Sequence, residues 1–251
     1  MSPAVLNVER ATLDWPVAVW RADQLGRSAP RVWPSGFAAL DAELPGGGWP
    51  GHGLTEWLLP HPGALEWRLL APLLARCDAE GRSVLVVGPP QPPHPPGLHQ
   101  YGVSARHLVW LHARTPAERL WSTEQLIKAN PGGIVLSWLP QVKAAQLRRL
   151  QVLAAACETP VFICRPEGVA REASAAPLRV RAQAAPGWGL VLDILKRKGP
   201  PLTRALTLQA VPPAWQAVLP PRLHPGVRPV VVPEIAHVVV RPVPEPEHAL
   251  H

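Results

Sequence analysis

Apolar residues alternate along the chain between short continuous runs and stretches with helical spacing. Runs rich in Val, Leu and Ile predict buried strands at residues 54–59, 83–87, 107–112, 133–139, 160–164 and 189–195. Apolar residues three or four positions apart predict helices over 64–79, 115–130 and 141–158. Strands that alternate with helices in this way indicate an α/β fold with a mostly parallel sheet.

Local signals sharpen some of these boundaries. Thr115, Pro116 and Glu118 provide an N-cap, a proline at the first helical position and a capping-box glutamate, so a helix is expected to begin there. Pro72 lies inside the helix predicted over 64–79 and is expected to kink it. The run 89–97 (PPQPPHPPG) predicts a stiff surface loop at the carboxyl end of a strand, where α/β proteins bind their ligands.

The chain divides into three parts. We expect a lead-in over residues 1–33, one α/β domain over 34–210 and a proline-rich tail over 211–251. In the lead-in, residues 17–25 (VAVWRADQL) form a candidate short helix or docking segment, with Trp20 packed on the core. The tail carries two valine triplets, 230–232 and 238–240, which leaves three interpretations open: docking on a partner, return to its own domain, or an inert tail.

Composition narrows the class of protein. With 47% hydrophobic and 17% charged residues, disorder throughout is excluded. The net charge of +7 permits contact with nucleic acid or with an acidic partner but requires neither. Three cysteines without CxxC spacing favour a reducing, cytoplasmic setting. No export signal and no apolar run of about 20 residues are apparent, so we expect no membrane association.

Phosphate-binding chemistry is missing where the strand pattern leads one to look for it. The strand predicted at 54–59 leads into a loop, Pro60-His61-Pro62-Gly63-Ala64-Leu65, and then into a helix. A P-loop ends in Lys-Ser/Thr, because the lysine meets the β- and γ-phosphates and the hydroxyl holds magnesium. Ala64 and Leu65 occupy those two positions, and prolines lack the N–H that donates to phosphate. The predicted scaffold resembles that of an ATPase, while the loop lacks the catalytic residues.

Several motifs in order along the chain resemble a known family. The stretch 33–74, the predicted strands and the end Leu192-Asp193-Ile194-Leu195-Lys196-Arg197-Lys198-Gly199 resemble the RecA-like ATPase core. More closely, three blocks are similar to the bacterial ImuA family: 20–25 (WRADQL), 34–50 (PSGFAALDAELPGGGWP) and 194–200 (ILKRKGP). The likeness covers about residues 17–205.

The resemblance implies an accessory factor of SOS-type translesion DNA synthesis, with a RecA-like fold. Its expected partners are ImuB, a catalytically inactive polymerase relative, then RecA or an error-prone DnaE-type polymerase. The division inhibitor SulA, which is also similar to a RecA core without its ATPase parts, provides the nearest alternative. A weak single-stranded-DNA-binding module is a further one.

The same resemblance locates the positions that decide the mechanism. Glu56 takes the place of the glutamate before the P-loop. Ser137 stands where an aspartate would position magnesium, and Arg165 stands where RecA has its sensing glutamine. Without the phosphoryl-transfer lysine and the metal-holding groups we expect no ATP hydrolysis, so the protein is predicted to be no enzyme and to use no cofactor.

The candidate binding residues are therefore basic ones. Lys196, Arg197 and Lys198 resemble the group that reaches a neighbouring subunit's nucleotide in RecA filaments; here they would hold DNA phosphate or an acidic partner, or simply end a solvated strand. Arg148 and Arg149 mark an interaction face or a solubilising pair. Histidines at 94, 99, 107 and 112 lack the Cys or carboxylate that would complete a metal site, and no serine has a nucleophile's partners.

Overall fold

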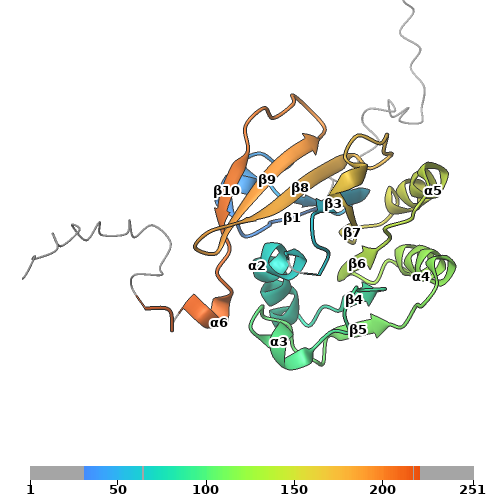
Figure 1. Cartoon of the computed structure of the whole chain (residues 1–251). Coiled ribbons are helices and arrows are strands. Elements are labelled where there is room, and N and C mark those ends of the chain that lie inside the picture. Colours follow the sequence, from blue (N-terminus) through green and yellow to red (C-terminus); the bar gives the residue numbers. More distant parts are fainter. Residues whose placement is uncertain (1–30, 64, 217, 221–251) are drawn as a thin grey trace, which may run out of the picture.

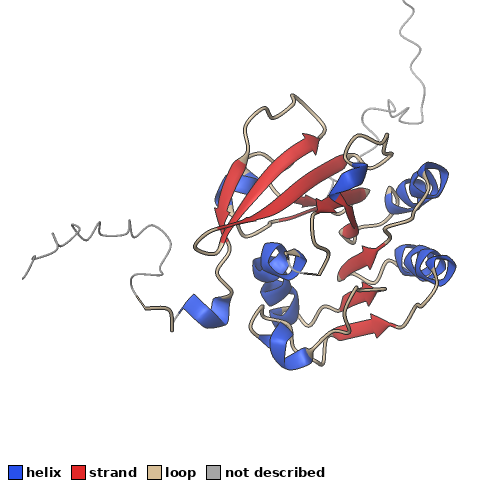
Figure 2. Cartoon of the chain, viewed as in Figure 1, coloured by secondary structure: helices blue, strands red, loops and turns tan. Residues whose placement is uncertain are grey.

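A computed structural model describes residues 31–63, 65–216 and 218–220 of the 251-residue chain. Figure 1 shows the order of the elements and Figure 2 their types. The elements that build the layers are β3 (Leu54–Leu59), α2 (Glu66–Ala79), β4 (Val84–Val87), α3 (Pro95–His99), β5 (Leu108–Leu111), α4 (Pro116–Ala129), β6 (Ile134–Trp138), α5 (Ala144–Ala154), β7 (Val161–Pro166), β8 (Leu178–Ala185), β9 (Gly189–Lys196) and β10 (Leu206–Gln209). Smaller ones are β1 (Val32–Trp33), α1 (Ala38–Asp41), β2 (Trp49–Pro50), the 3₁₀ turn η1 (Glu167–Val169) and α6 (Pro213–Gln216).

The main sheet has eight strands in the order β10-β9-β8-β3-β7-β6-β4-β5. Five of its seven strand pairs are parallel, and only β9 runs against the others, because it pairs antiparallel with both β8 and β10. The predicted α/β fold with a mostly parallel sheet is therefore confirmed.

Helices cover both faces of the sheet, with α2 and α3 on one side and α4 and α5 on the other (Figure 1). Side chains that alternate along each parallel strand supply two separate cores. On the α2 side the largest group is aromatic: the ring of Trp57 lies 4.6 Å from that of Phe162 and 5.6 Å from that of Trp49, centre to centre. On the other side Leu147 and Leu150 of α5 pack against β3, β6 and β7.

The small β1–β2 sheet closes one end of the first core. Val32 pairs with Pro50 and Trp33 with Trp49, and Trp33 and Trp49 are buried. A glycine run permits this close pairing, since a Cβ added to Gly48 would lie 2.6 Å from the carbonyl oxygen of Trp33. The sequence block 34–50 thus folds back on the strand just before it.

The predicted helix cap at residue 115 is confirmed in detail. The Thr115 side chain accepts a hydrogen bond from the Glu118 N–H, and the Glu118 carboxylate accepts from the Thr115 N–H in return. At the other end Asn130 adopts a left-handed conformation with φ of 45°. Both ends of α4 are therefore fixed by local sequence.

Four local predictions need correction. The helix predicted over 141–158 is shorter, because Lys143 is its N-cap and the carbonyl of Ala154 accepts from Gly53 outside the helix. The proline-rich run 89–97 is a loop only in part, since Pro95 and Pro96 begin α3. The strand predicted at 160–164 extends further, so that Arg165 lies within β7, and the alternating sequence of β8 is a strand that the prediction omitted.

Candidate functional site

The turn between β3 and α2 stands where a nucleotide-binding protein would hold phosphate. β3 is the central strand, hydrogen-bonded to β7 on one side and β8 on the other, and all six of its residues are buried. Gly63 has a φ of 93°, which a glycine adopts without strain. The chain therefore makes the tight turn at the N-terminus of α2, a place where backbone N–H groups favour an anion.

The anion at this turn is the protein's own side chain. Glu66, the first residue of α2, is fully buried and its carboxylate accepts three hydrogen bonds. Oε1 accepts from the Gly63 N–H at 2.7 Å and from the indole Nε1–H of Trp138 at 2.7 Å, and Oε2 accepts from the Leu65 N–H at 3.1 Å. Two backbone donors that would otherwise face a phosphate are thus occupied from inside the fold.

The surroundings of this turn leave little room for a ligand. A cavity of about 240 Å³ lies beside Gly63, walled by Pro89, Pro90 and other residues of the proline-rich connection to α3. That volume is below the range of about 300–1,000 Å³ typical of ligand pockets. Burial raises the pKa of the Cys164 thiol, and the nearby Glu66 carboxylate raises it further. The turn is filled by the buried Glu66 carboxylate.

Glu56 and Arg165, singled out from the sequence as nucleotide-site positions, form a buried ion pair. The Glu56 carboxylate lies 2.8 Å from Arg165 and 2.7 Å from Arg179, and the three side chains are 0%, 5% and 8% exposed. Since one carboxylate is shared by two guanidinium groups, the cluster joins β3, β7 and β8 at the centre of the sheet. Both predicted positions are engaged in holding the fold.

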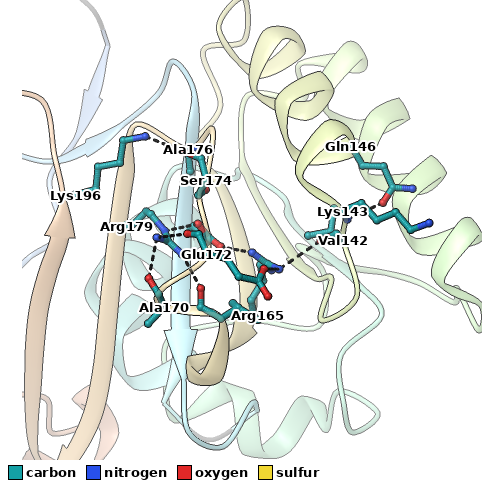
Figure 3. Close-up of polar contacts among 12 residues, drawn as sticks. Val142, Lys143, Gln146, Arg165, Ala170, Glu172, Ser174, Ala176, Arg179 and Lys196 are labelled. Atoms are coloured by element: carbon teal, nitrogen blue, oxygen red, sulfur yellow. Dashed lines mark hydrogen bonds and ion pairs between the residues drawn. The ribbon is translucent and has the colours of Figure 1, made fainter.

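Arg179 extends the cluster to the loop after β7. Its guanidinium donates to the carbonyl oxygens of Val169, Ala170 and Glu172 at 3.0–3.2 Å, and Arg165 also contacts the Glu172 carboxylate at 3.1 Å (Figure 3). These hydrogen bonds satisfy backbone carbonyl groups at and just after the end of the 3₁₀ turn η1. The sequence reasoning did not identify Arg179, although the alternation of Arg and apolar residues in 178–182 was a signal for it.

Ser137, at the position of a magnesium-positioning aspartate, is also buried. Its Oγ lies 2.9 Å from the hydroxyl of Thr123 on α4, with which it shares a hydrogen bond. A neutral serine tied to a threonine offers a cation no negative charge. Among the described residues no group of three or more His, Cys, Asp and Glu side chains is placed to hold a metal.

The basic residues at the end of β9 lie in three different settings. Lys196 is exposed, and its ammonium donates to the carbonyl of Ser174 at 2.9 Å (Figure 3). Arg197 is held by Glu43, with 2.9 Å between guanidinium and carboxylate. Lys198 is exposed and makes no ion pair within the described part of the chain. Lys196 and Lys198 thus present free charge at the surface, while Arg197 connects the end of β9 to the turn after α1.

Arg148 and Arg149 lie on α5, far along the chain from this group. Arg149 forms an ion pair with Glu124 of α4, which ties the two helices together. Arg148 is exposed, and no ion pair of its side chain is present in the ranges that the structure describes. The structure therefore gives the two predicted interaction arginines different environments.

A further cationic hollow was missed by the sequence reasoning. A cavity of about 480 Å³ lies between the N-terminal ends of α4 and α5, at the carboxyl edge of the sheet, and three cations line it: Arg114, Arg119 and Lys143. These residues belong to two segments some 25 positions apart, so no local motif reveals that they face one cavity.

The chain was compared with known proteins. No family model matches it. Two curated relatives are similar, each named cell division inhibitor SulA: that of Edwardsiella piscicida is 29% identical over 156 residues, 62% of this chain and 83% of the relative. That of Photorhabdus laumondii is 29% identical over 112 residues, 45% of this chain and 63% of the relative. The relationship to SulA proteins is distant. In the described residues, no helix has the length and apolarity to cross a membrane.

Proposed function

We propose that this protein is a non-catalytic accessory protein of SOS-type translesion DNA synthesis, a member of the ImuA family that acts by binding other proteins. Its partner is an ImuB-like polymerase homologue, with RecA or an error-prone DnaE-type polymerase as further members of the complex. The distant similarity to SulA proteins supports a role in the SOS response, and the three sequence blocks similar to ImuA support the more specific assignment.

The occupied turn before α2 is the observation that carries the non-catalytic part of the proposal. Phosphoryl transfer depends on a lysine and a metal held against the phosphates, and on donors aimed at the developing charge. Here Glu66 takes the backbone donors of Gly63 and Leu65, and Ser137 replaces a metal-holding carboxylate. A second anion at the turn would meet the repulsion of a buried carboxylate.

Free cations at the surface support binding to an acidic partner. Lys196, Lys198 and Arg148 are exposed, while Arg197 and Arg149 are used within the fold. The same charges allow a weak contact with DNA phosphate, which would weaken steeply with salt. We therefore assign partner recognition to the two lysines and to Arg148 rather than to all five basic residues.

Inhibition of cell division is the second candidate, because the curated relatives carry that name. A protein of this type also works through binding and needs no nucleotide site of its own. The two candidates differ in the partner, which gives a direct test with purified components.

The test is binding of the full chain to a purified ImuB-like polymerase homologue, by pull-down and titration, beside an assay of FtsZ assembly. We expect binding to the polymerase homologue, a loss of about ten-fold for the double variant Lys196→Glu, Lys198→Glu, and little change for the matched control Lys128→Glu on α4. Absence of binding to the polymerase homologue, together with inhibition of FtsZ assembly, would replace the proposal by the second candidate.

A further inference from the structure

A large apolar cavity lies at the end of the molecule that carries β1 and β2. Its volume is about 720 Å³, within the range that encloses a ligand or several large side chains. One wall comes from the beginning of the described chain, with Val32, Pro45, Gly46 and Pro50. The other wall comes from the start of β8 and the segment after β9, with Pro177, Leu178, Lys198 and Gly199. No residue of the turn between β3 and α2 contributes to it.

Two of the three sequence blocks that resemble the ImuA family meet in this cavity. Pro45, Gly46 and Pro50 belong to the block 34–50, and Lys198 and Gly199 to the block 194–200. About 150 residues separate the two blocks in the sequence, yet they face one hollow. The third block, 20–25, lies outside the described residues and just upstream of Arg31, which itself lines the cavity.

The shape of the hollow depends on a glycine. Gly46 has a φ of 87°, and a Cβ added to it would lie 2.7 Å from a methyl carbon of Val32. Any other residue would strain the turn and push Val32 out of its position in β1. Val32 is half-buried and pairs with Pro50, so the apolar wall is part of the fold rather than a loose surface.

Charge at the rim has one sign. The two charged residues of the lining, Arg31 and Lys198, are cations, and no Asp or Glu of the described residues lines the cavity. Arg31 contacts Glu158 at 3.7 Å and lies over the ring of Trp33, whereas Lys198 makes no ion pair in that part of the chain. The fitting occupant is therefore an apolar segment with one carboxylate.

We propose that residues 17–25 of the same chain dock in this cavity. Their sequence, VAVWRADQL, supplies Val17, Val19, Trp20 and Leu25 for the apolar walls, and Asp23 is the only carboxylate in the segment, available to Lys198. Leu25 lies six positions before Arg31, and an extended chain covers about 20 Å over that length. The tether gives the segment an effective concentration in the mM range, so modest affinity holds it in place. This inference does not rest on the proposed function; when the segment is docked, Asp23 engages Lys198, and the exposed Lys196 and Arg148 remain for a partner.

Hydrogen exchange of the full chain, read by mass spectrometry, tests the docking. A site with a dissociation constant on the order of 0.1 mM would hold a tethered segment about nine-tenths of the time. Amide exchange in 17–25 is then about ten-fold slower than in residues 3–13, which serve as the internal reference. Val32→Asp places a charge in the wall and is expected to remove this protection; the matched control Val152→Asp, on an exposed α5 position, is expected to leave it.

A second variant keeps the test decisive if Val32→Asp fails to fold. Lys198→Glu changes an exposed side chain and is expected to reduce protection of 17–25, while the double variant Asp23→Lys, Lys198→Glu restores it. Exchange in 17–25 as fast as in 3–13 would overturn the proposal. So would protection that survives both cavity variants, or that falls on dilution, which would identify a second copy as the source of the segment.

Discussion

Replacing Glu66 with glutamine tests whether the buried carboxylate holds the turn before α2. The carboxylate has two accepting oxygens, of which one receives the Gly63 and Trp138 N–H groups and the other the Leu65 N–H. Glutamine is nearly the same size but keeps a single acceptor. Its amide NH₂ would face the Leu65 N–H, donor against donor, at a buried position.

The expected loss of stability follows from these three bonds. A buried donor left without a partner costs about 1–3 kcal/mol. Hydrogen bonds to an ionised acceptor are roughly twice as strong as those to a neutral one, so the two retained bonds also weaken. Relief of the buried charge opposes these losses. The N-terminus of α2 itself favours an anion by about 0.3–1 kcal/mol, and the neutral glutamine loses this contribution. We therefore expect a net destabilisation of about 2 kcal/mol.

Equilibrium unfolding in urea, followed by circular dichroism, measures this change if the slope with denaturant is unaltered. Glu80→Gln at the exposed C-cap of the same helix is the matched control and is expected to cost much less, because its ion pair with Arg76 is exposed to solvent. A Glu66→Gln protein as stable as the wild type, or more stable, would refute the reasoning. It would mean that the three donors do not offset the burial of the charge.

Three further outcomes follow from other charged and polar groups of the fold. Glu56→Gln breaks two buried ion pairs and should lower the free energy of unfolding by about 3–5 kcal/mol in the same urea assay. Arg149→Ala removes a pair whose arginine is 61% exposed and should cost less than about 1 kcal/mol. Equal losses for the two variants would contradict the burial argument. The Ser104 hydroxyl lowers the pKa of Asp78, so this group stabilises the fold fully above the ordinary aspartate pKa and loses that effect as pH falls through the lower folded value. Asp78→Asn should therefore flatten the acid limb of a plot of melting temperature against pH, and an unchanged limb would count against the contact. Burial raises the pKa of Cys77 to about 11, so a thiol reagent at pH 8 should label it rapidly only after unfolding; fast labelling of the folded protein would disprove its burial.

Much of the fold could be predicted because the parallel strands carry their signal locally. Four of the six residues of Leu54–Leu59 are apolar, as expected of a strand buried on both faces, and its predicted bounds are those observed. The antiparallel part was harder. β8 alternates apolar and polar residues, with Arg179 and Arg181 among them, and a search for continuous apolar runs passes over this pattern.

The absence of P-loop residues could be predicted from the sequence, but the occupation of the turn by the Glu66 carboxylate could not. Missing lysine and hydroxyl groups at 64–65 can be read directly from the sequence. The role of Glu66 depends on Trp138, which is 72 positions away and reaches it only because β6 ends beside the turn. Likewise Glu56 meets Arg165 and Arg179 across three neighbouring strands, and strand order is a property of the whole sheet.

We propose that the fold serves to bind other proteins, while the turn before α2 is filled by the Glu66 carboxylate of the chain itself. Titration of the full chain with a fluorescent ATP analogue, with and without magnesium, tests this most directly. We predict no saturable binding up to about 1 mM, the upper end of the usual range for enzyme substrates. Saturable, magnesium-dependent binding that is displaced by unlabelled ATP would contradict the account.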